Sequence, residues 1–215
     1  MKGEKILTQT LRNWARSETA KRLRREITFL ATLILIVLAA RSSLADHYHV
    51  PSGSMLPTLQ IGDHVLVNKL AYGARVPFSN LYLVDFNGPI RGDVVVLDSP
   101  EDGELLIKRV VATPGDRIAV SNGRLILNGQ PVGLSSGQAG LIENLDLKPH
   151  PINLTNGGGP DYGPRLIPDN HYLVMGDNRG NSNDGRYFGL VERSSILGQA
   201  VAVFYGRGGF VWRPL

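Results

Sequence analysis

Beyond residue 50 no segment of the chain keeps a helical hydrophobic period over three turns, and this restricts that part to a β-rich fold. Short apolar runs rich in β-branched residues recur instead, and such runs are typical of strands. They occupy residues 65–67, 94–97, 105–111, 117–120, 125–127, 172–174 and 200–205. The 25 glycines and 13 prolines supply turns between them. We therefore expect a mainly β domain of coiled or barrel-like antiparallel sheets.

Turn signals within this domain predict where neighbouring strands connect. Asn122-Gly123 and Asn128-Gly129 each follow a short apolar run, and Asn-Gly is a strong signal for a two-residue hairpin turn. The segment 114–116 (PGD) is a further turn signal.

Residues 131–170 differ from the rest because Gly, Pro, Asn and Ser dominate, with GGGP at 157–160. They form either one long loop or a small subdomain inserted between two strands of the main sheet. Loops of this length are uncommon in compact domains, so a loop-rich inserted subdomain is the preferred interpretation.

The N-terminal region combines a basic tail with an apolar run. Residues 1–26 hold eight Lys or Arg against three Glu, and residues 27–40 are largely apolar. As a helix this run spans ~21 Å, and extension to Ala45 gives ~28 Å, close to the ~30 Å hydrocarbon core of a bilayer. Arg41 would then extend its guanidinium into the headgroups. We expect a cytoplasmic tail (1–26), a transmembrane anchor (27–45) and an exported domain (46–215).

A cleaved secretory signal is the competing interpretation of the same segment, since residues 43–45 (SLA) resemble a small-x-small cleavage site. The 26-residue leading segment is longer than a usual basic n-region and favours an uncleaved anchor. In both cases the positive-inside rule keeps residues 1–25 in the cytoplasm and exports the domain after the apolar run.

Composition excludes several classes of function. The formal charge of +4 is concentrated in the terminal tail, so a basic nucleic-acid-binding face is not predicted. The absence of cysteine excludes disulfides, thiol catalysis and thiolate metal sites. His47 and His49 have no third ligand nearby in the sequence, so neither a metal nor another cofactor is predicted.

Three polar clusters could carry chemistry, and they hold one serine and one lysine of interest. The clusters are residues 51–59 (PSGSMLPTL), residues 91–93 (RGD) with 107–109 (IKR), and residues 175–186 (MGDNRGNSNDGR). Ser54 needs a base to become a nucleophile, yet no histidine lies in an obvious catalytic context. Lys108 is either a solvent-facing lysine on an edge strand or a buried amine whose lowered pKa lets it accept a proton. The third cluster is either simple turn chemistry or a support for such an amine.

Taken together, the order and content of these clusters resemble the signature boxes of bacterial type I signal peptidases (leader peptidases), a family of Ser-Lys serine proteases. Residues 52–59 resemble the nucleophile box, residues 62–73 the second box, residues 91–116 the lysine box and residues 176–186 the last box. The resemblance covers residues 50–198 and is loosest in 131–170.

The resemblance implies a signal peptidase/LexA-like fold and a membrane-bound endopeptidase that removes signal peptides from exported preproteins after small residues. It implies a single-pass protein of the bacterial inner membrane with a periplasmic catalytic domain. It also implies roles for the site residues. Ser54 would be the nucleophile and Lys108 the general base, and Ser52 with the Ser54 N–H would form the oxyanion hole.

The resemblance further implies supporting residues and substrate pockets. Ser182 would orient Lys108, and Asp184 and Arg186 would buttress the turn. Shallow substrate pockets would be lined by Val50, Met55, Leu59 and Ile107.

The chain also departs from the family pattern. Gly180 stands where an acidic residue is common, and Gly185 where serine is common. Alternative functions are a narrower Ser-Lys peptidase of the pilin or conjugation type, a LexA-like repressor, for which a DNA-binding segment is missing, or a non-enzymatic anchored periplasmic β domain. The Ser-Lys mechanism requires the Lys108 amine within ~2.6–3.2 Å of the Ser54 hydroxyl.

Overall fold

A computed structural model describes residues 18–75, 82–137, 140–146 and 148–215 of the chain. The chain divides into two compact units after Ser42. Residues 1–17 of the expected basic tail lie outside the described residues.

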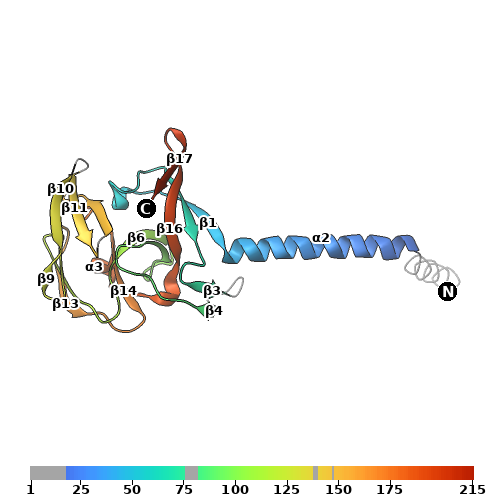
Figure 1. Ribbon diagram of the computed structural model, residues 1–215, viewed down its shortest axis with the longest axis horizontal. Helices are drawn as coiled ribbons and strands as arrows, with labels where there is room; N and C mark the ends of the chain where they lie inside the picture. Colours follow the sequence, from blue (N-terminus) through green and yellow to red (C-terminus); the bar gives the residue numbers. More distant parts are fainter. Residues whose placement is uncertain (1–17, 76–81, 138–139, 147) are drawn as a thin grey trace. The chain divides into compact units, whose positions relative to one another are not determined.

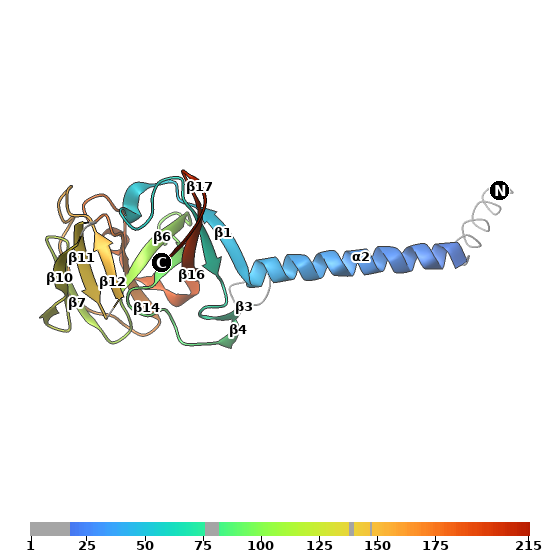
Figure 2. The ribbon, with the colours of Figure 1, turned by 45° about the horizontal axis from the view of Figure 1, so that its top comes forward.

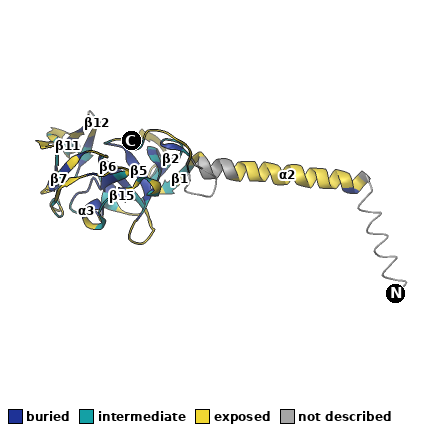
Figure 3. Ribbon diagram, turned by 90° about the horizontal axis from the view of Figure 1, so that it is seen from below, coloured by how far each residue is buried: buried dark blue, intermediate teal, exposed yellow. Residues whose placement is uncertain are grey.

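The first unit contains one long helix, α2 (Glu18–Ser43). Straight-chain residues with high helix propensity and an Arg22–Glu26 ion pair at 3.3 Å support its first turns. All its large apolar side chains from Ile27 to Leu38 are exposed, as Figure 3 shows along the helix. Judged by length and hydropathy, none of the helices in the described part of the chain suffices to cross a membrane.

The helical segment ends earlier than the sequence predicted. We expected the anchor to reach Ala45, whereas α2 ends at Ser43 and Ala45 already belongs to a strand. The reason is pairing: Ala45 lies opposite Asn68 in an antiparallel ladder, which requires an extended backbone.

The second unit is built on an antiparallel sheet (Figures 1 and 2). Its strands are β1 (Ala45–His49), β2 (His64–Asn68), β5 (Val94–Asp98), β6 (Leu105–Ala112), β14 (His171–Met175), β15 (Val191–Glu192), β16 (Ile196–Gly206) and β17 (Gly209–Pro214). Their order is β1-β2-β16-β5-β6-β14-β15, with β17 on β16. A short pair, β3 (Gly73–Arg75) and β4 (Tyr82–Asp85), stands apart.

Irregular pairing along β16 curves this sheet. The register of β16 shifts against β2, β5 and β17, and such bulges bend a strand and increase its twist. The prediction of a mainly β domain with curled antiparallel sheets is confirmed.

The stretch of chain that connects β6 to β14 forms two smaller sheets. One has the order β13-β7-β8-β9, from β7 (Arg117–Ser121), β8 (Arg124–Leu127), β9 (Gln130–Pro131) and β13 (Tyr162–Leu166). The other joins β10 (Gly133–Gly137), β11 (Gly140–Leu145) and β12 (Lys148–Ile152). In the described part of residues 131–170, which we expected to be a loop-rich inserted subdomain, somewhat more than half of the residues thus lie in strands. The reason is pairing again, since β13 returns to the strand β7 that precedes the segment.

Both predicted Asn-Gly hairpins are present in the first of these sheets. Asn122 and Gly123 have φ angles of 48° and 74°, and Asn128 and Gly129 have 52° and 80°. Positive φ at both central residues defines the turn type that matches strand twist.

The buried core next to the main sheet holds the segment after β1 in place. That segment forms a single 3₁₀ turn, η1 (Gly53–Met55). Met55 and Leu59 pack into one cluster with Val65, Val67 and Val203 of β2 and β16. The remaining short helices are η2 (Arg193–Ser195) and α3 (Gly185–Phe188), the latter capped by the Asp184 carboxylate.

A substitution at Gly158 tests how tightly the inserted region packs on the β7–β8 turn. A Cβ at this position would overlap the backbone of Asn122 and Gly123. We expect Gly158→Ala to lower the free energy of unfolding by about 2–4 kcal/mol in chemical denaturation. Gly208→Ala is the control, because a Cβ there meets no described atom within 4 Å. Equal stabilities of the two variants would contradict this packing.

Candidate active site

Ser54 lies in the η1 turn directly after β1, where local and distant contacts hold the backbone. Leu56 N–H donates to the Gly53 carbonyl at 3.2 Å and closes the turn. The Met55 side chain anchors it in the core. The Asn178 N–H donates to the Ser54 carbonyl at 3.0 Å, which ties the turn to the segment after β14. The Ser54 side chain remains partly exposed.

Lys108 lies in β6 and is only 3% exposed. Its Nζ donates to Ser54 Oγ at 2.9 Å and to the Ile107 carbonyl at 3.2 Å. The distance to Ser54 is the one that a Ser-Lys pair requires. Ser52 Oγ lies 3.4 Å from Ser54 Oγ. The hydroxyls of the expected nucleophile and of the expected oxyanion donor are therefore adjacent.

The surroundings of Lys108 favour the neutral amine. Burial lowers the pKa of Lys108 from 10.5 to about 8, while the carboxylates of Asp184 and Asp177 act in the opposite direction. At pH 7 about one molecule in ten therefore carries a neutral amine able to accept a proton from Ser54.

A cavity of about 430 Å³ opens beside Ser54 and Lys108. Val50, Met55 and Ile107 line it, as three of the four expected pocket residues. Leu59 does not line it. The turn directs Leu59 inward, because its N–H donates to the Met55 carbonyl at 2.9 Å and its side chain is fully buried in the core.

Further residues line this cavity that the sequence patterns did not single out. They are Tyr48, His49, Val96, Glu104, Leu105 and Leu106. Most of them belong to β1 and β6, next to the residues already identified. Their place beside the nucleophile and lysine boxes was the available signal.

Ser182 is buried, and no hydrogen bond joins it to Lys108 in this structure. Among the described residues its Oγ has no hydrogen-bond partner. It lies against Gly176, where a Cβ would also come within 2.5 Å of the Ser54 carbonyl oxygen. The glycine thus permits the close approach of Ser182 to the nucleophile turn.

Asp184 and Arg186 form a buried bidentate pair. Arg186 Nε donates to Asp184 Oδ1 at 2.8 Å and Nη2 donates to Oδ2 at 2.9 Å. Asp184 Oδ2 also accepts the Gly176 N–H at 2.9 Å, and Arg186 Nη2 reaches the Arg179 carbonyl at 2.6 Å. The pair therefore joins both ends of the segment between β14 and α3.

Two other buried ion pairs, which sequence reasoning missed, fix the same segment. Arg109 grips Asp177 with two hydrogen bonds of 2.8 and 2.7 Å. Arg179 grips Glu143 of β11 with two of 2.9 and 2.5 Å. Burial raises the pKa of each carboxyl, but the facing guanidinium, together with His150 and, for Asp177, a hydrogen bond from Thr58, holds both pKa values below the usual range. Both arginines stood in the signature boxes, beside Lys108 and Asn178.

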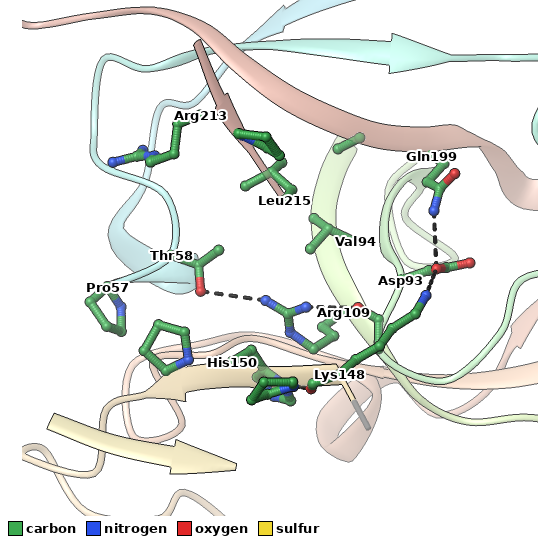
Figure 4. Close-up of a pocket in the computed structure, with 15 residues that line it drawn as sticks. Pro57, Thr58, Asp93, Val94, Arg109, Lys148, His150, Gln199, Arg213 and Leu215 are labelled. Carbon is green, nitrogen blue, oxygen red and sulfur yellow. Dashed lines mark hydrogen bonds and ion pairs between the residues drawn. The ribbon is translucent and has the colours of Figure 1, made fainter. Parts of the chain in front are cut away.

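A second cavity, of about 500 Å³, is lined by charged residues but not by Ser54 or Lys108. In Figure 4 Arg109 points toward Thr58, and Asp93 lies between Lys148 and Gln199. Lys148 Nζ and Gln199 Nε2 donate to Asp93 Oδ1 at 2.8 and 3.0 Å. These charges are satisfied within the protein, where β12 faces the main sheet.

Comparison with known proteins identifies the family. A family model described as "Signal peptidase, peptidase S26" matches residues 23–205. The chain belongs to this family. A signal peptidase I from Pseudomonas fluorescens is 39% identical over 195 residues, covering 80% of this chain and 69% of its own. One from Leptolyngbya laminosa is 35% identical over 182 residues, covering 80% and 74%.

A signal peptidase I crystal structure, from Enterococcus faecalis V583, covers 54% of this chain and 98% of its own. Its sequence identity is 23% and its TM-score is 0.38.

The two glycines that depart from the family pattern lie at close backbone contacts. A Cβ at Gly180 would overlap Asn156 and come within 2.5 Å of the Gly157 carbonyl oxygen. A Cβ at Gly185 would come within 2.9 Å of the Val174 carbonyl oxygen. The inserted region packs against the first and β14 against the second, so a side chain at either position would displace backbone.

Lys108 should cost the folded protein stability at neutral pH. Its pKa falls from 10.5 to about 8 on folding, so the buried ammonium is disfavoured below about pH 8. This cost is full below pH 8 and disappears as pH rises to 10.5, because the unfolded chain then binds more protons than the folded one. At pH 7 we expect the free energy of unfolding of Lys108→Met to exceed that of wild type by roughly 3 kcal/mol. Chemical denaturation measures this difference as a higher denaturant midpoint.

The matched control is Ser54→Ala, which keeps the buried amine. The stability difference between Lys108→Met and Ser54→Ala should shrink between pH 8 and pH 10. A difference that stays constant over this range would mean that the Lys108 pKa is not lowered on folding.

Proposed function

We propose that this chain is a membrane-bound serine endopeptidase that removes N-terminal signal peptides from exported preproteins after small residues. The observation that carries the proposal is the 2.9 Å contact between the buried Lys108 amine and Ser54 Oγ. Membership of the signal peptidase family and the open cavity beside the pair support it.

In the proposed mechanism Lys108 acts first as base and then as acid. Neutral Lys108 takes the Ser54 proton while Ser54 Oγ attacks the scissile carbonyl carbon. The tetrahedral intermediate collapses to an acyl-enzyme, and the ammonium of Lys108 returns the proton to the departing amine. Lys108 then takes a proton from the water that attacks the ester carbonyl. When this second tetrahedral intermediate collapses, Lys108 returns the proton to Ser54 Oγ and the carboxylic acid product leaves.

The Ser54 N–H and the Ser52 hydroxyl are the proposed donors to the oxyanion. Such a donor typically contributes roughly 3 kcal/mol to the transition state. Ser182 is a proposed support of the amine: its Oγ, which has no hydrogen-bond partner in the described part of the chain, would meet Lys108 when substrate binds. The Asp184–Arg186 pair holds the segment that carries it.

Strand edges beside the cavity suit an extended substrate. Among the described strands β1 pairs only with β2, and β14 pairs with β6 only from Arg109 onward. Beside the cavity, the edges of residues 48–49 and 105–106 therefore keep backbone groups available to a peptide added as a strand. The walls formed by Val50, Met55 and Ile107 then favour small side chains on the substrate by excluding larger ones.

The N-terminal segment is proposed to hold the enzyme at the bacterial inner membrane in a single pass, with the tail (1–26) in the cytoplasm and the catalytic domain in the periplasm. The proposed anchor begins at residue 27 and ends with α2 at Ser43. The large apolar side chains from Ile27 to Leu38, exposed along α2, support it. Lys21, Arg22, Arg24 and Arg25 precede them, in agreement with the positive-inside rule.

Preprotein cleavage tests the mechanism. Ser54→Ala and Lys108→Ala should each lower kcat/KM by about 10⁴-fold or more, since the dyad acts as a unit. In wild type, kcat/KM should fall about tenfold per pH unit below the Lys108 pKa of about 8, because only the neutral amine is active. The exposed Asn181→Ala, in the same segment as Ser182, is the control.

Near-normal cleavage by either dyad variant would defeat the mechanism. Cleavage of several unrelated preproteins is expected of a general signal peptidase. Cleavage restricted to one of them would favour a dedicated processing peptidase.

Membrane anchoring is tested by alkaline extraction of membranes from cells that express the full chain. Wild type should stay in the pellet and need detergent for release. Lysine at both Leu33 and Leu35 costs roughly 3 kcal/mol per charge within a bilayer and should shift the protein to the soluble fraction. Isoleucine at the same two positions is the control, and extraction of wild type without detergent would refute the anchor.

A further inference from the structure

Asn178 makes two contacts with the nucleophile turn from outside that turn. Its backbone N–H donates to the Ser54 carbonyl at 3.0 Å, and its side-chain Nδ2 donates to the Gly53 carbonyl at 2.9 Å. Asn178 is 3% exposed. Its Oδ1 is buried and has no partner among the described residues. The hydrogen bond from Nδ2 to the Gly53 carbonyl is therefore the interaction that the side-chain amide contributes.

The backbone of Asn178 is itself fixed. Asn153 forms a parallel bridge with Asn178: its N–H donates to the Asp177 carbonyl at 2.8 Å, and its carbonyl accepts the Arg179 N–H at 3.0 Å. The neighbouring side chains are the Asp177 and Arg179 of the two buried ion pairs. The amide of Asn178 therefore projects toward Gly53 from a rigid base.

The contact with Gly53 sets the direction of the Ser54 N–H. The Gly53 carbonyl and the Ser54 N–H belong to one trans, planar peptide unit and point in opposite directions. A donor that holds the Gly53 oxygen therefore also fixes the Ser54 N–H, the proposed oxyanion donor. Leu56 N–H also donates to Gly53 at 3.2 Å, but it belongs to the same turn and moves with it.

We propose that Asn178 is the positioning residue of the oxyanion hole, acting through the Gly53–Ser54 peptide without touching substrate. The inference rests on the proposed function of Ser54 and assigns a role to a side chain that the Ser-Lys pair does not explain. Asn178 should lower the free energy of the transition state and not that of the bound substrate, because the negatively charged oxygen forms only in the transition state.

The test replaces Asn178 by Leu, which keeps the shape of the side chain but removes the donor. The backbone N–H to Ser54 remains in this variant. We expect kcat for a preprotein to fall roughly tenfold to a hundredfold with KM nearly unchanged. The pH midpoint of kcat/KM should not move, because Lys108 is untouched. Asn181→Leu, exposed in the same segment, is the matched control, and Asn178→Ala serves if the Leu variant fails to fold.

A second measurement separates positioning from a merely structural role. A peptide aldehyde adds reversibly to Ser54: Oγ bonds to the carbonyl carbon, the π pair moves to oxygen, and Lys108 accepts the hydroxyl proton. The corresponding peptide alcohol binds without forming an oxyanion. In Asn178→Leu the aldehyde should lose affinity by the same factor as kcat/KM, while the alcohol should bind as to wild type.

Two results would overturn the positioning role: equal losses for aldehyde and alcohol, or a kcat within about twofold of wild type. A wild-type chain that neither cleaves preprotein nor binds the aldehyde would overturn the proposed function itself. Wild-type activity that Ser54→Ala abolishes but Asn178→Leu leaves intact would overturn only the role of Asn178.

Discussion

The withdrawal of one amine from water is the constraint on which the rest of the site depends. Lys108 is 3% exposed, and burial lowers its pKa to about 8. Asp177 and Asp184 lie close enough to favour the ammonium, but each is already paired with an arginine. Those arginines partly neutralise the carboxylates, so desolvation prevails and the amine can serve as a base.

The alternation of side chains along β6 lets one strand serve two purposes. Lys108 lines the cavity beside Ser54, whereas Arg109 lines the other cavity and grips Asp177. Neighbouring residues of a strand point to opposite faces, so the buried amine and the arginine of the ion pair that supports its surroundings occupy consecutive positions. Breaking such a buried pair by removing one partner costs about 3–5 kcal/mol, which suits a group that must hold a turn rigid.

Hydrogen bonds from three parts of the domain hold the segment between β14 and α3 in place. Arg109 reaches it from the main sheet, Glu143 from the inserted region, and Arg186 from its own end. Gly180 lets the inserted backbone lie against this segment. The inserted region thus contributes to the site through Glu143 and Asn153, although it does not line the cavity beside Ser54.

The sequence by itself determined the strand-rich character of the domain and both Asn-Gly hairpins, because β-branched runs and positive-φ turns are local properties. It singled out Ser54 and Lys108 as a candidate pair only through the resemblance of the boxes around them. It could not show that Lys108 is buried, that Leu59 turns into the core, or that β10, β11 and β12 form a sheet of their own. Nor could it pair Arg179 with Glu143 or bring Asn178 to Gly53. Those features depend on contacts between residues far apart in the chain, and burial, which sets the Lys108 pKa, exists only once the sheets have closed around it.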